Sequence, residues 1–361
     1  MNPNEVERYS RQLLLPEVGK EGQERLKAAK VLVIGAGGLG CPILQYLTGA
    51  GIGHIGIIDD DVVSVSNLHR QILYGTSSVG HNKAEAAKTR LSDLNPEITI
   101  VAYPKRLTTK NAVALFSTYD IIVDGSDNFS TRYLVNDACI LTNKPLVYGA
   151  IYKFQGQVSV FNYQNGPSYR CLFPDPPAPG DAPSCSEIGV IGVLPGIIGT
   201  FQANEVIKMI LGIGTVASGH IQLIHTLTSA ITSLKINRNQ KVIDEVLRRK
   251  DQFETYNYDV FCGINSSIAE ITFDEALQLE NAIFIDVREP HEQPKIGTLN
   301  PLYIPLSEIN TVAARLEKNK TFVCFCQSGI RSKKAVALLM DIGLKNTYSL
   351  KQGAPLLAQV L

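Results

Sequence analysis

The stretch VLVIGAGGLG, residues 31–40, carries the strongest structural signal in the chain. Its branched apolar residues predict a buried strand, and four glycines follow it: Gly35, Gly37, Gly38 and Gly40. Glycines allow a tight turn in which the backbone approaches a phosphate closely. The next segment, CPILQYLTGAGIG (41–53), predicts a helix whose first turn attracts anions. Strand, glycine loop and helix in this order are typical of a nucleotide-binding unit.

Further short apolar runs repeat this pattern along the chain. HIGIIDDDVV (54–63), YDIIVDGSDN (119–128) and KPLVYGAIY (144–152) each end in a polar turn. Strands that alternate with helices pack as a parallel sheet covered on both faces. The sequence therefore predicts an α/β fold with a doubly wound, Rossmann-like, mostly parallel sheet.

A second strand and helix pattern begins near residue 266. It includes AIFIDVRE, TFVCFCQSG and the helical RSKKAVALLMDIG. We expect a nucleotide-binding domain over residues 1–236, a charged linker or crossover over 237–265, and a small α/β domain over 266–361.

Composition limits the classes of partner. The chain has 361 residues, 45% of them hydrophobic, and a formal net charge of +0. This balance gives no sign of a nucleic-acid or membrane surface. The polar N-terminus and the lack of an apolar run of membrane-spanning length favour a cytoplasmic protein. The seven scattered cysteines indicate thiols, metal ligands or nucleophiles rather than a disulfide framework.

Charged residues after the glycine loop favour a triphosphate over a dinucleotide. Asp59 follows the loop at the spacing, about 20 residues, of an acid that binds ribose hydroxyls. SNLHRQ (66–71) then supplies Asn67 and Arg70, and Lys83 follows. An NAD site has no need of added cations, whereas cleavage of a triphosphate develops charge that Arg, Lys and Mg²⁺ stabilise.

Other polar residues extend this candidate site. Asp127 and Asn128 follow a strand end, where an open α/β sheet binds its ligands, and a carboxylate there could hold Mg²⁺. Arg8 and Arg11 precede the first strand. Each cation alone is more simply a solvated surface charge, so the interpretation depends on their joint spacing.

A different device lies near the C-terminus, in CFCQSGIRS (324–332). The loop from Cys326 to Arg331 can wrap backbone N–H groups around the sulfur and add a cation at its far end, which favours a thiolate or another anion. Cys324, on the same strand face, is expected in the core.

Six segments of the first domain resemble the MoeB/ThiF/HesA family: RYSRQLLLPEVG, GAGGLGCP, DDDVVSVSNLHRQ, GHNKAEAAKTRLSDLNP, DGSDNFSTRYLVNDAC and GQVSVFNY. The family consists of ubiquitin-activating-enzyme-like adenylyltransferases that act on sulfur-carrier proteins. The resemblance spans residues 4–235 and implies a homodimer. Its substrate would be the C-terminal Gly-Gly carboxylate of a small ubiquitin-like carrier, for molybdopterin, thiamine or another thio-product.

The resemblance also implies roles for individual residues. Asp127 would hold Mg²⁺, and Arg11 would reach the ATP of the partner subunit. The ATP-binding residues would be Gly38, Asp59, Ser66, Asn67, Leu68, His69, Arg70, Lys83, Asp127 and Asn128.

Two cysteine positions bear on this comparison. Cys185, in APSCSEIG, matches the cysteine that attacks the adenylate in relatives with a fused C-terminal domain, although a small structural residue at a helix start explains it equally well. The family binds zinc through two C-x-x-C pairs. Here Ser168 replaces one cysteine, Cys171 remains, and 237–257 contains none. We therefore expect no structural zinc.

The C-terminal domain resembles rhodanese, whose loop cysteine carries a persulfide. IDVREPHE (285–292) and SLKQGAPL (349–356) match further rhodanese motifs, whereas KIGTLNPLYIPL (295–306) departs from the usual middle motif. The resemblance implies that Cys326 carries sulfur, that Arg331 stabilises the persulfide, and that a cysteine desulfurase or thiosulfate is the donor.

Three other interpretations stay open from the sequence. An NAD-dependent oxidoreductase would not need Arg70, Lys83 or the second domain. A non-catalytic scaffold that docks carrier and donor would function without Asp127. An enzyme with the same chemistry could act on a tRNA base, although the neutral net charge argues against nucleic acid.

Overall fold

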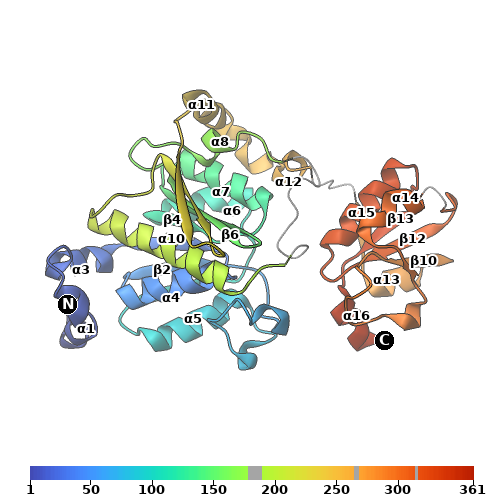
Figure 1. Ribbon diagram of the computed structural model, residues 1–361, viewed down its shortest axis with the longest axis horizontal. Helices are drawn as coiled ribbons and strands as arrows, with labels where there is room; N and C mark the ends of the chain where they lie inside the picture. The colour runs from blue at the N-terminus through green and yellow to red at the C-terminus, as the bar shows by residue number, and fades with distance from the viewer. Residues whose placement is uncertain (178–188, 264–267, 314–315) are drawn as a thin grey trace. The chain divides into compact units, whose positions relative to one another are not determined.

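A computed structural model describes residues 1–177, 189–263, 268–313 and 316–361. The chain forms two compact units, Met1–Gly263 and Ile264–Leu361, which are described one at a time (Figure 1). Cys185 lies outside the described residues. Among the described helices, none combines the length and the apolar character needed to cross a bilayer.

The first unit is built on an eight-stranded sheet. Its strands are β1 (Lys30–Ile34), β2 (His54–Ile58), β3 (Thr99–Tyr103), β4 (Ile121–Asp124), β5 (Leu146–Tyr152), β6 (Gln155–Phe161), β7 (His220–His225) and β8 (Ala230–Lys235). Their order is β3-β2-β1-β4-β5-β6-β7-β8. The first five in that order are parallel, and β6, β7 and β8 add antiparallel pairs. The predicted mostly parallel α/β sheet is confirmed.

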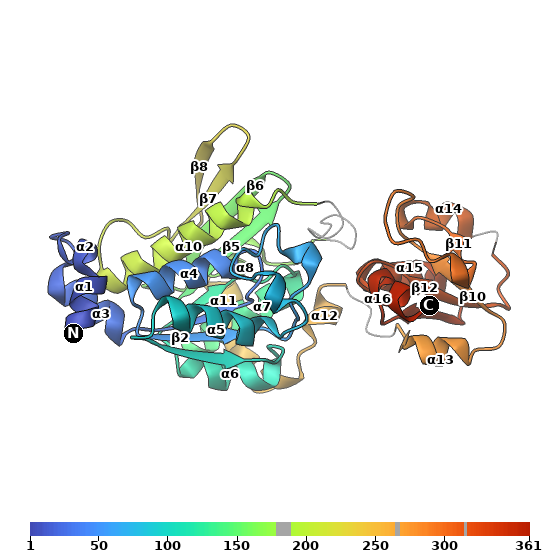
Figure 2. The ribbon, with the colours of Figure 1, turned by 90° about the horizontal axis from the view of Figure 1, so that it is seen from below.

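Both faces of this sheet are covered by helices. Val31 and Val33 of β1 face one core, and Leu32 and Ile34 face the other, as the two-residue period of a strand requires. The first core includes α3 (Gly19–Ala28), α4 (Gly40–Ala50), α5 (Lys83–Leu94) and α10 (Val193–Leu211), and the second includes α6 (Thr109–Ser117), α7 (Phe129–Thr142) and α8 (Tyr169–Leu172). Helices α4 and α10 lie side by side in both views (Figure 1 and Figure 2).

Strand β1 lies between β2 and β4, and the chain reverses its direction of winding there. Connections from β1 run outward through β2 to β3, and then return to β4 on the other side. Ligands of open α/β sheets bind outside the carboxyl ends of the strands at such a switch point. The glycine loop leaves β1 at this position.

Residues 237–263 are not a linker. They form α11 (Gln240–Arg248), η3 (Lys250–Thr255) and α12 (Tyr258–Phe261), which belong to the first unit. Ile243 and Val246 are buried against Ile140 of α7, so the charged segment is amphipathic and packs through its apolar stripe. The high charge content of 237–257 obscures this stripe in the sequence.

The second unit has a smaller parallel sheet, with strand order β11-β10-β12-β13-β9. Its strands are β9 (Glu270–Ile271), β10 (Ala282–Asp286), β11 (Leu302–Tyr303), β12 (Thr321–Phe325) and β13 (Thr347–Leu350). Its helices include α13 (Phe273–Leu277), α14 (Ile309–Ala313), α15 (Ile330–Asp341) and α16 (Ala354–Val360). Ile285 and Cys324 face one core, and Phe284 and Val323 face the other. The unit is therefore a small α/β fold.

Candidate active sites

The glycine loop turns sharply between β1 and α4. Gly35 has φ +84°, a conformation that side chains rarely adopt, and a Cβ there would lie 3.0 Å from the Gly125 carbonyl oxygen. A Cβ on Gly40 would collide with the Gly35 carbonyl. The loop after β1 therefore packs closely against the loop after β4, and glycine is required at both positions.

Asp59 fastens this loop to the end of β2. Its Oδ2 accepts the Ala36 N–H at 2.7 Å, and its Oδ1 accepts the Asp61 N–H at 2.8 Å. Burial raises the pKa of the Asp59 carboxyl, although these donors favour the charged form. Each carboxylate oxygen has a second lone pair, so the group can still accept from a ribose hydroxyl.

Asn67 ends a short helical turn, η1 (Val65–Asn67), and Arg70 lies in the turn that follows it, beside the glycine loop. The Arg70 Nη2 donates to Asn67 Oδ1 at 2.8 Å, and its Nη1 donates to the Ser66 carbonyl at 3.0 Å. His69 Nε2 lies 2.9 Å from the same Nη1. The side chain of Leu68 is half-buried and packs on the first core. A Cβ on Gly38 would come 3.8 Å from Arg70 Cγ, so the arginine borders the glycine loop.

Lys83 begins α5 and is held at the same edge of the sheet. Its side chain is 7% exposed, and Nζ lies 3.0 Å from Asp61 Oδ2. The Tyr74 hydroxyl donates to the carbonyls of Ala36 and Lys83, which links α5 to the glycine loop. Asp61 and Tyr74 are not among the residues predicted from the sequence, although the DDD run at 59–61 contains Asp61.

Asp127 and Asn128 follow β4. Asp127 is exposed, whereas Asn128 caps α7 by accepting the Thr131 N–H at 2.9 Å. Behind them, Asp124 Oδ2 is buried without a hydrogen-bond partner. The described residues include no cluster of three or more metal-binding side chains. One exposed carboxylate suits Mg²⁺ that takes its other ligands from phosphates and water.

Arg11 is not brought to this site by its own chain. It lies in α2 (Ser10–Leu13), and the neighbouring Gln12 donates to the Ala50 carbonyl at the C-terminal end of α4. The glycine loop is at the other end of that helix, which has 11 residues and spans about 16 Å.

The described chain resumes at residue 189, and Gly192 lies against the loop that holds His69 and Arg70. A Cβ on Gly192, seven residues after Cys185, would collide with the His69 carbonyl. Burial raises the pKa of Cys41 to about 12 and that of Cys139 well above its ordinary value, so these two buried thiols are poorly suited to nucleophilic attack.

Cys171 takes part in hydrogen bonds where the family would place a metal. Its Sγ accepts the N–H groups of Ser168 at 3.3 Å and Asn239 at 3.2 Å. One thiol, one hydroxyl and backbone groups do not fit a tetrahedral zinc site. That the protein lacks zinc stays a prediction.

The cysteine loop of the second unit joins β12 to α15. Cys326 is 1% exposed, and its Sγ accepts the Gly329 N–H at 3.1 Å. Gly329 has φ +86°, which turns its N–H toward the sulfur. The Ser332 hydroxyl lies 3.7 Å from the sulfur. Burial raises the pKa of Cys324, which lies in the core as predicted.

The third rhodanese-like motif supports this loop. The Ala354 N–H donates to the Cys326 carbonyl at 2.9 Å. A Cβ on Gly353 would collide with the Gln327 carbonyl, so only glycine fits there. The segment 295–306, which differs from the usual middle rhodanese motif, forms β11 and the short helical turn η4 (Gly297–Leu299), and it ends where η5 (Leu306–Glu308) begins.

Arg331 lies at the end of the loop but forms an ion pair with Glu292, with 2.6 Å between Nη2 and Oε2. Asp286 and Arg288 form a second buried pair, 2.7 Å apart, and Arg288 Nη1 donates to Gln327 Oε1. Glu292 is not predicted from the sequence as a partner of Arg331, although it is the last residue of IDVREPHE (285–292).

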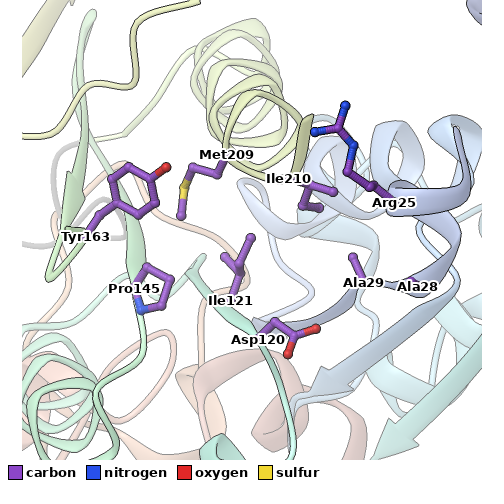
Figure 3. Close-up of a pocket in the computed structure, with 9 residues that line it drawn as sticks. All are labelled: Arg25, Ala28, Ala29, Asp120, Ile121, Pro145, Tyr163, Met209 and Ile210. Atoms are coloured by element: carbon purple, nitrogen blue, oxygen red, sulfur yellow. The ribbon is translucent and has the colours of Figure 1, made fainter. Parts of the chain in front are cut away.

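A shallow cavity of about 400 Å³ lies at the amino ends of β1, β4 and β5, away from the glycine loop (Figure 3). Its charged groups already have partners: Arg25 donates to the Leu211 carbonyl, and Asp120 accepts the Lys30 N–H. None of the predicted site residues lines it.

The family of the chain is established by comparison. Residues 9–244 match the ThiF family, and residues 271–356 match the rhodanese-like domain. The chain therefore belongs to the ThiF family and carries a C-terminal rhodanese-like domain, as the resemblance predicted.

Named relatives match most or nearly all of this chain. A "Sulfur carrier protein adenylyltransferase" of Thermus thermophilus is 52% identical over 72% of this chain and 97% of its own length. The "Probable adenylyltransferase/sulfurtransferase MoeZ" of Mycobacterium tuberculosis is 40% identical over 98% of this chain and 93% of its own. "Adenylyltransferase and sulfurtransferase MOCS3" of Xenopus laevis is 37% identical over 97% and 81%. The chain is thus an enzyme of the adenylyltransferase class with a sulfurtransferase domain.

Solved structures share the fold of the first unit. MccB of E. coli, in a structure described as containing ATP, is 25% identical over 64% of this chain and 72% of its own, with a TM-score of 0.56. PaaA is 23% identical over 65% and 75%, also with a TM-score of 0.56.

Proposed function

We propose that the first unit uses ATP to adenylate the C-terminal Gly-Gly carboxylate of a ubiquitin-like sulfur-carrier protein. The observation that supports this most strongly is the convergence of a glycine loop, Asp59, Arg70, Lys83 and Asp127 at the carboxyl edge of β1, β2 and β4. An NAD site would not require the two cations.

Each group has a role in this proposal. Backbone N–H groups of the glycine loop and the start of α4 bind phosphate, while Asp59 binds ribose. Asn67, Arg70 and Lys83 bind the phosphates, with Ser66, Leu68, His69 and Asn128 forming the surrounding wall. Asp127 would hold Mg²⁺, which neutralises phosphate charge when bound. In a homodimer, the partner subunit's Arg11 completes the site.

The chemistry follows from these positions. A carrier carboxylate oxygen attacks the α-phosphorus, the bond to the bridging oxygen breaks, and pyrophosphate leaves with the electron pair. Arg70 and Lys83 stabilise the negative charge that develops on pyrophosphate. The acyl-adenylate then has a good leaving group, so a sulfur nucleophile can displace AMP.

Sulfur reaches the carrier through thiols. We assign Cys326 as the persulfide carrier, because Gly329 offers an N–H to its sulfur and Arg331 lies at the loop end. Cys185, which lies outside the described residues, is the proposed nucleophile that takes the acyl group, as the family resemblance implies. The persulfide sulfur attacks the thioester, the Cys185 thiolate leaves, and an acyl disulfide forms. A thiol then cleaves its S–S bond, which gives the carrier thiocarboxylate and a mixed disulfide on Cys326. A cysteine desulfurase or thiosulfate supplies the sulfur. Reactive thiols suit a reducing compartment such as the cytoplasm.

Exchange of labelled pyrophosphate into ATP tests the first half of this proposal. The full-length protein, ATP, Mg²⁺ and a Gly-Gly-tailed carrier should support exchange, and a carrier that lacks its last glycine should not. Equal exchange with the truncated carrier would contradict the assigned substrate. A Cys185→Ala variant should still form adenylate but should lose any covalent carrier–enzyme thioester.

A further inference from the structure

The arginines beside the cysteine loop are charge-balanced, which simple anion binding does not require. Arg331 forms a two-pronged pair with Glu292, with its Nη1 2.5 Å and its Nη2 2.6 Å from the two carboxylate oxygens. Arg288, which contacts Gln327 of the loop, holds Asp286 at 2.9 and 2.7 Å. Each guanidinium therefore faces a carboxylate.

The Glu292 pair is sheltered from solvent. The side chains of Glu292 and Arg331 are 20% and 13% exposed. Glu292 also accepts the Glu289 N–H at 2.8 Å, and its hydrogen bond with Arg331 lowers its pKa. The carboxylate is therefore charged at neutral pH, and solvent screens it less than a surface pair.

This balance affects the two possible donors differently. With thiosulfate, the Cys326 thiolate attacks the outer sulfur, the S–S bond breaks, and sulfite leaves with the electron pair. The site must then bind a small dianion. With a protein persulfide, the same attack releases a cysteine thiolate, and the donor protein's own surface supplies the binding energy.

We infer that Glu292 determines donor specificity: by neutralising Arg331 it weakens the binding of small dianions such as thiosulfate and favours a cysteine persulfide on a donor protein. This inference rests on the proposed role of Cys326 and names the donor class.

The test is a Glu292→Gln variant of the full-length protein, which keeps the shape of the side chain. In a thiosulfate–cyanide assay, its KM for thiosulfate should fall about tenfold while kcat changes less than about twofold, because one opposing charge is removed. With a cysteine desulfurase and cysteine as the sulfur source, the transfer rate should change less than about twofold.

A matched control is the ion pair of Lys333, which lies on helix α15 as Arg331 does. Glu270 pairs with Lys333 of α15 at 3.0 Å, so Glu270→Gln removes a comparable charge away from the loop and should leave KM unchanged. In an Arg331→Gln background, Glu292→Gln should have no further effect on KM. An unchanged or raised KM in the single variant, or an equal fall in the Arg331→Gln background, would overturn the inference.

Two further measurements distinguish failure of the proposed function from failure of the specificity inference, and one of them needs no variant. Undiminished sulfur transfer by Cys326→Ala would reject the proposed function itself, whereas the Glu292 result bears on specificity alone. The wild-type KM for thiosulfate should also vary little with salt, because the arginines are already neutralised. A KM that rises steeply with ionic strength would reveal unpaired positive charge and overturn the inference without any variant.

Discussion

The glycine loop after β1 and the cysteine loop after β12 are both tight turns between a parallel strand and a helix. Each has a residue at positive φ, Gly35 in one and Gly329 in the other. They differ in the charges around them. Arg70 is held by a neutral amide and a backbone carbonyl, whereas Arg331 is held by a carboxylate. The same backbone device therefore suits a polyanion in one unit and a single sulfur in the other.

The largest effect is expected for a substitution that abolishes the activity of the cysteine loop and leaves that of the glycine loop unchanged. Cys326→Ala removes the only sulfur in its loop, so thiocarboxylate formation from a persulfide donor should fall to background. Pyrophosphate exchange should be unchanged, because it depends on the other unit. Both rates are measured on one preparation without added sulfide. Wild-type thiocarboxylate formation by this variant would show that the cysteine loop is not the sulfur carrier.

Removing a cation beside the glycine loop should have the reverse selectivity. Arg70→Ala or Lys83→Ala should slow pyrophosphate exchange by about 10²-fold, because developing phosphate charge loses a preorganised partner. Thiosulfate–cyanide transfer should be unaffected. Lys88→Ala, an exposed cation on the same helix α5, is the matched control. If both site variants exchange at the wild-type rate, the ATP site lies elsewhere.

A smaller effect tests whether residues 237–263 stabilise the first unit alone. The Tyr258 hydroxyl donates to Asp137 Oδ2 at 2.8 Å, and Asp137 also binds Arg170 at 2.7 Å. Tyr258→Phe should lower the free energy of unfolding of the first unit by about 1 kcal/mol. Denaturant unfolding with a probe in each unit would measure this. Equal destabilisation of the second unit would argue against independent units.

The smallest expected effect is that of chelation. Extensive treatment with a zinc chelator should leave the unfolding midpoint of both units unchanged, because Cys171 is surrounded by hydrogen-bond donors instead of metal ligands. Metal analysis should find well under one zinc per chain. Stoichiometric, chelator-resistant zinc would show that ligands outside the described residues complete a site.

Local sequence patterns were sufficient to predict the fold class. The run of apolar residues into Gly35 predicted β1 and α4, because strand period and glycine geometry are local properties. Residues 237–257 were misinterpreted because their few apolar side chains are covered by residues far earlier in the chain, such as Ile140 of α7 and Cys171 of α8.

The sequence predicts where the candidate site residues lie in the fold, but not which side chains they contact. Asp59 and Lys83 could be placed at strand and helix ends, since those ends meet at the switch point. The pairing of Arg331 with Glu292 joins residues 39 positions apart and depends on how β10 and β12 align, which no local pattern encodes. The proposed role of Arg11 would require a second subunit, which neither the sequence nor the single chain describes.

The contact of Ala354 with the Cys326 carbonyl has a consequence for biosynthesis. Ala354 is translated well after Cys326, yet its N–H forms a hydrogen bond that supports the cysteine loop. A nascent chain that contains β12 but not yet residues 353–356 therefore lacks the contacts that support the loop around the Cys326 thiol. The contacts of Gly353 and Ala354 with the loop can form only after the start of α16 has been made, so we expect the Cys326 loop to reach its final shape late in the folding of its unit.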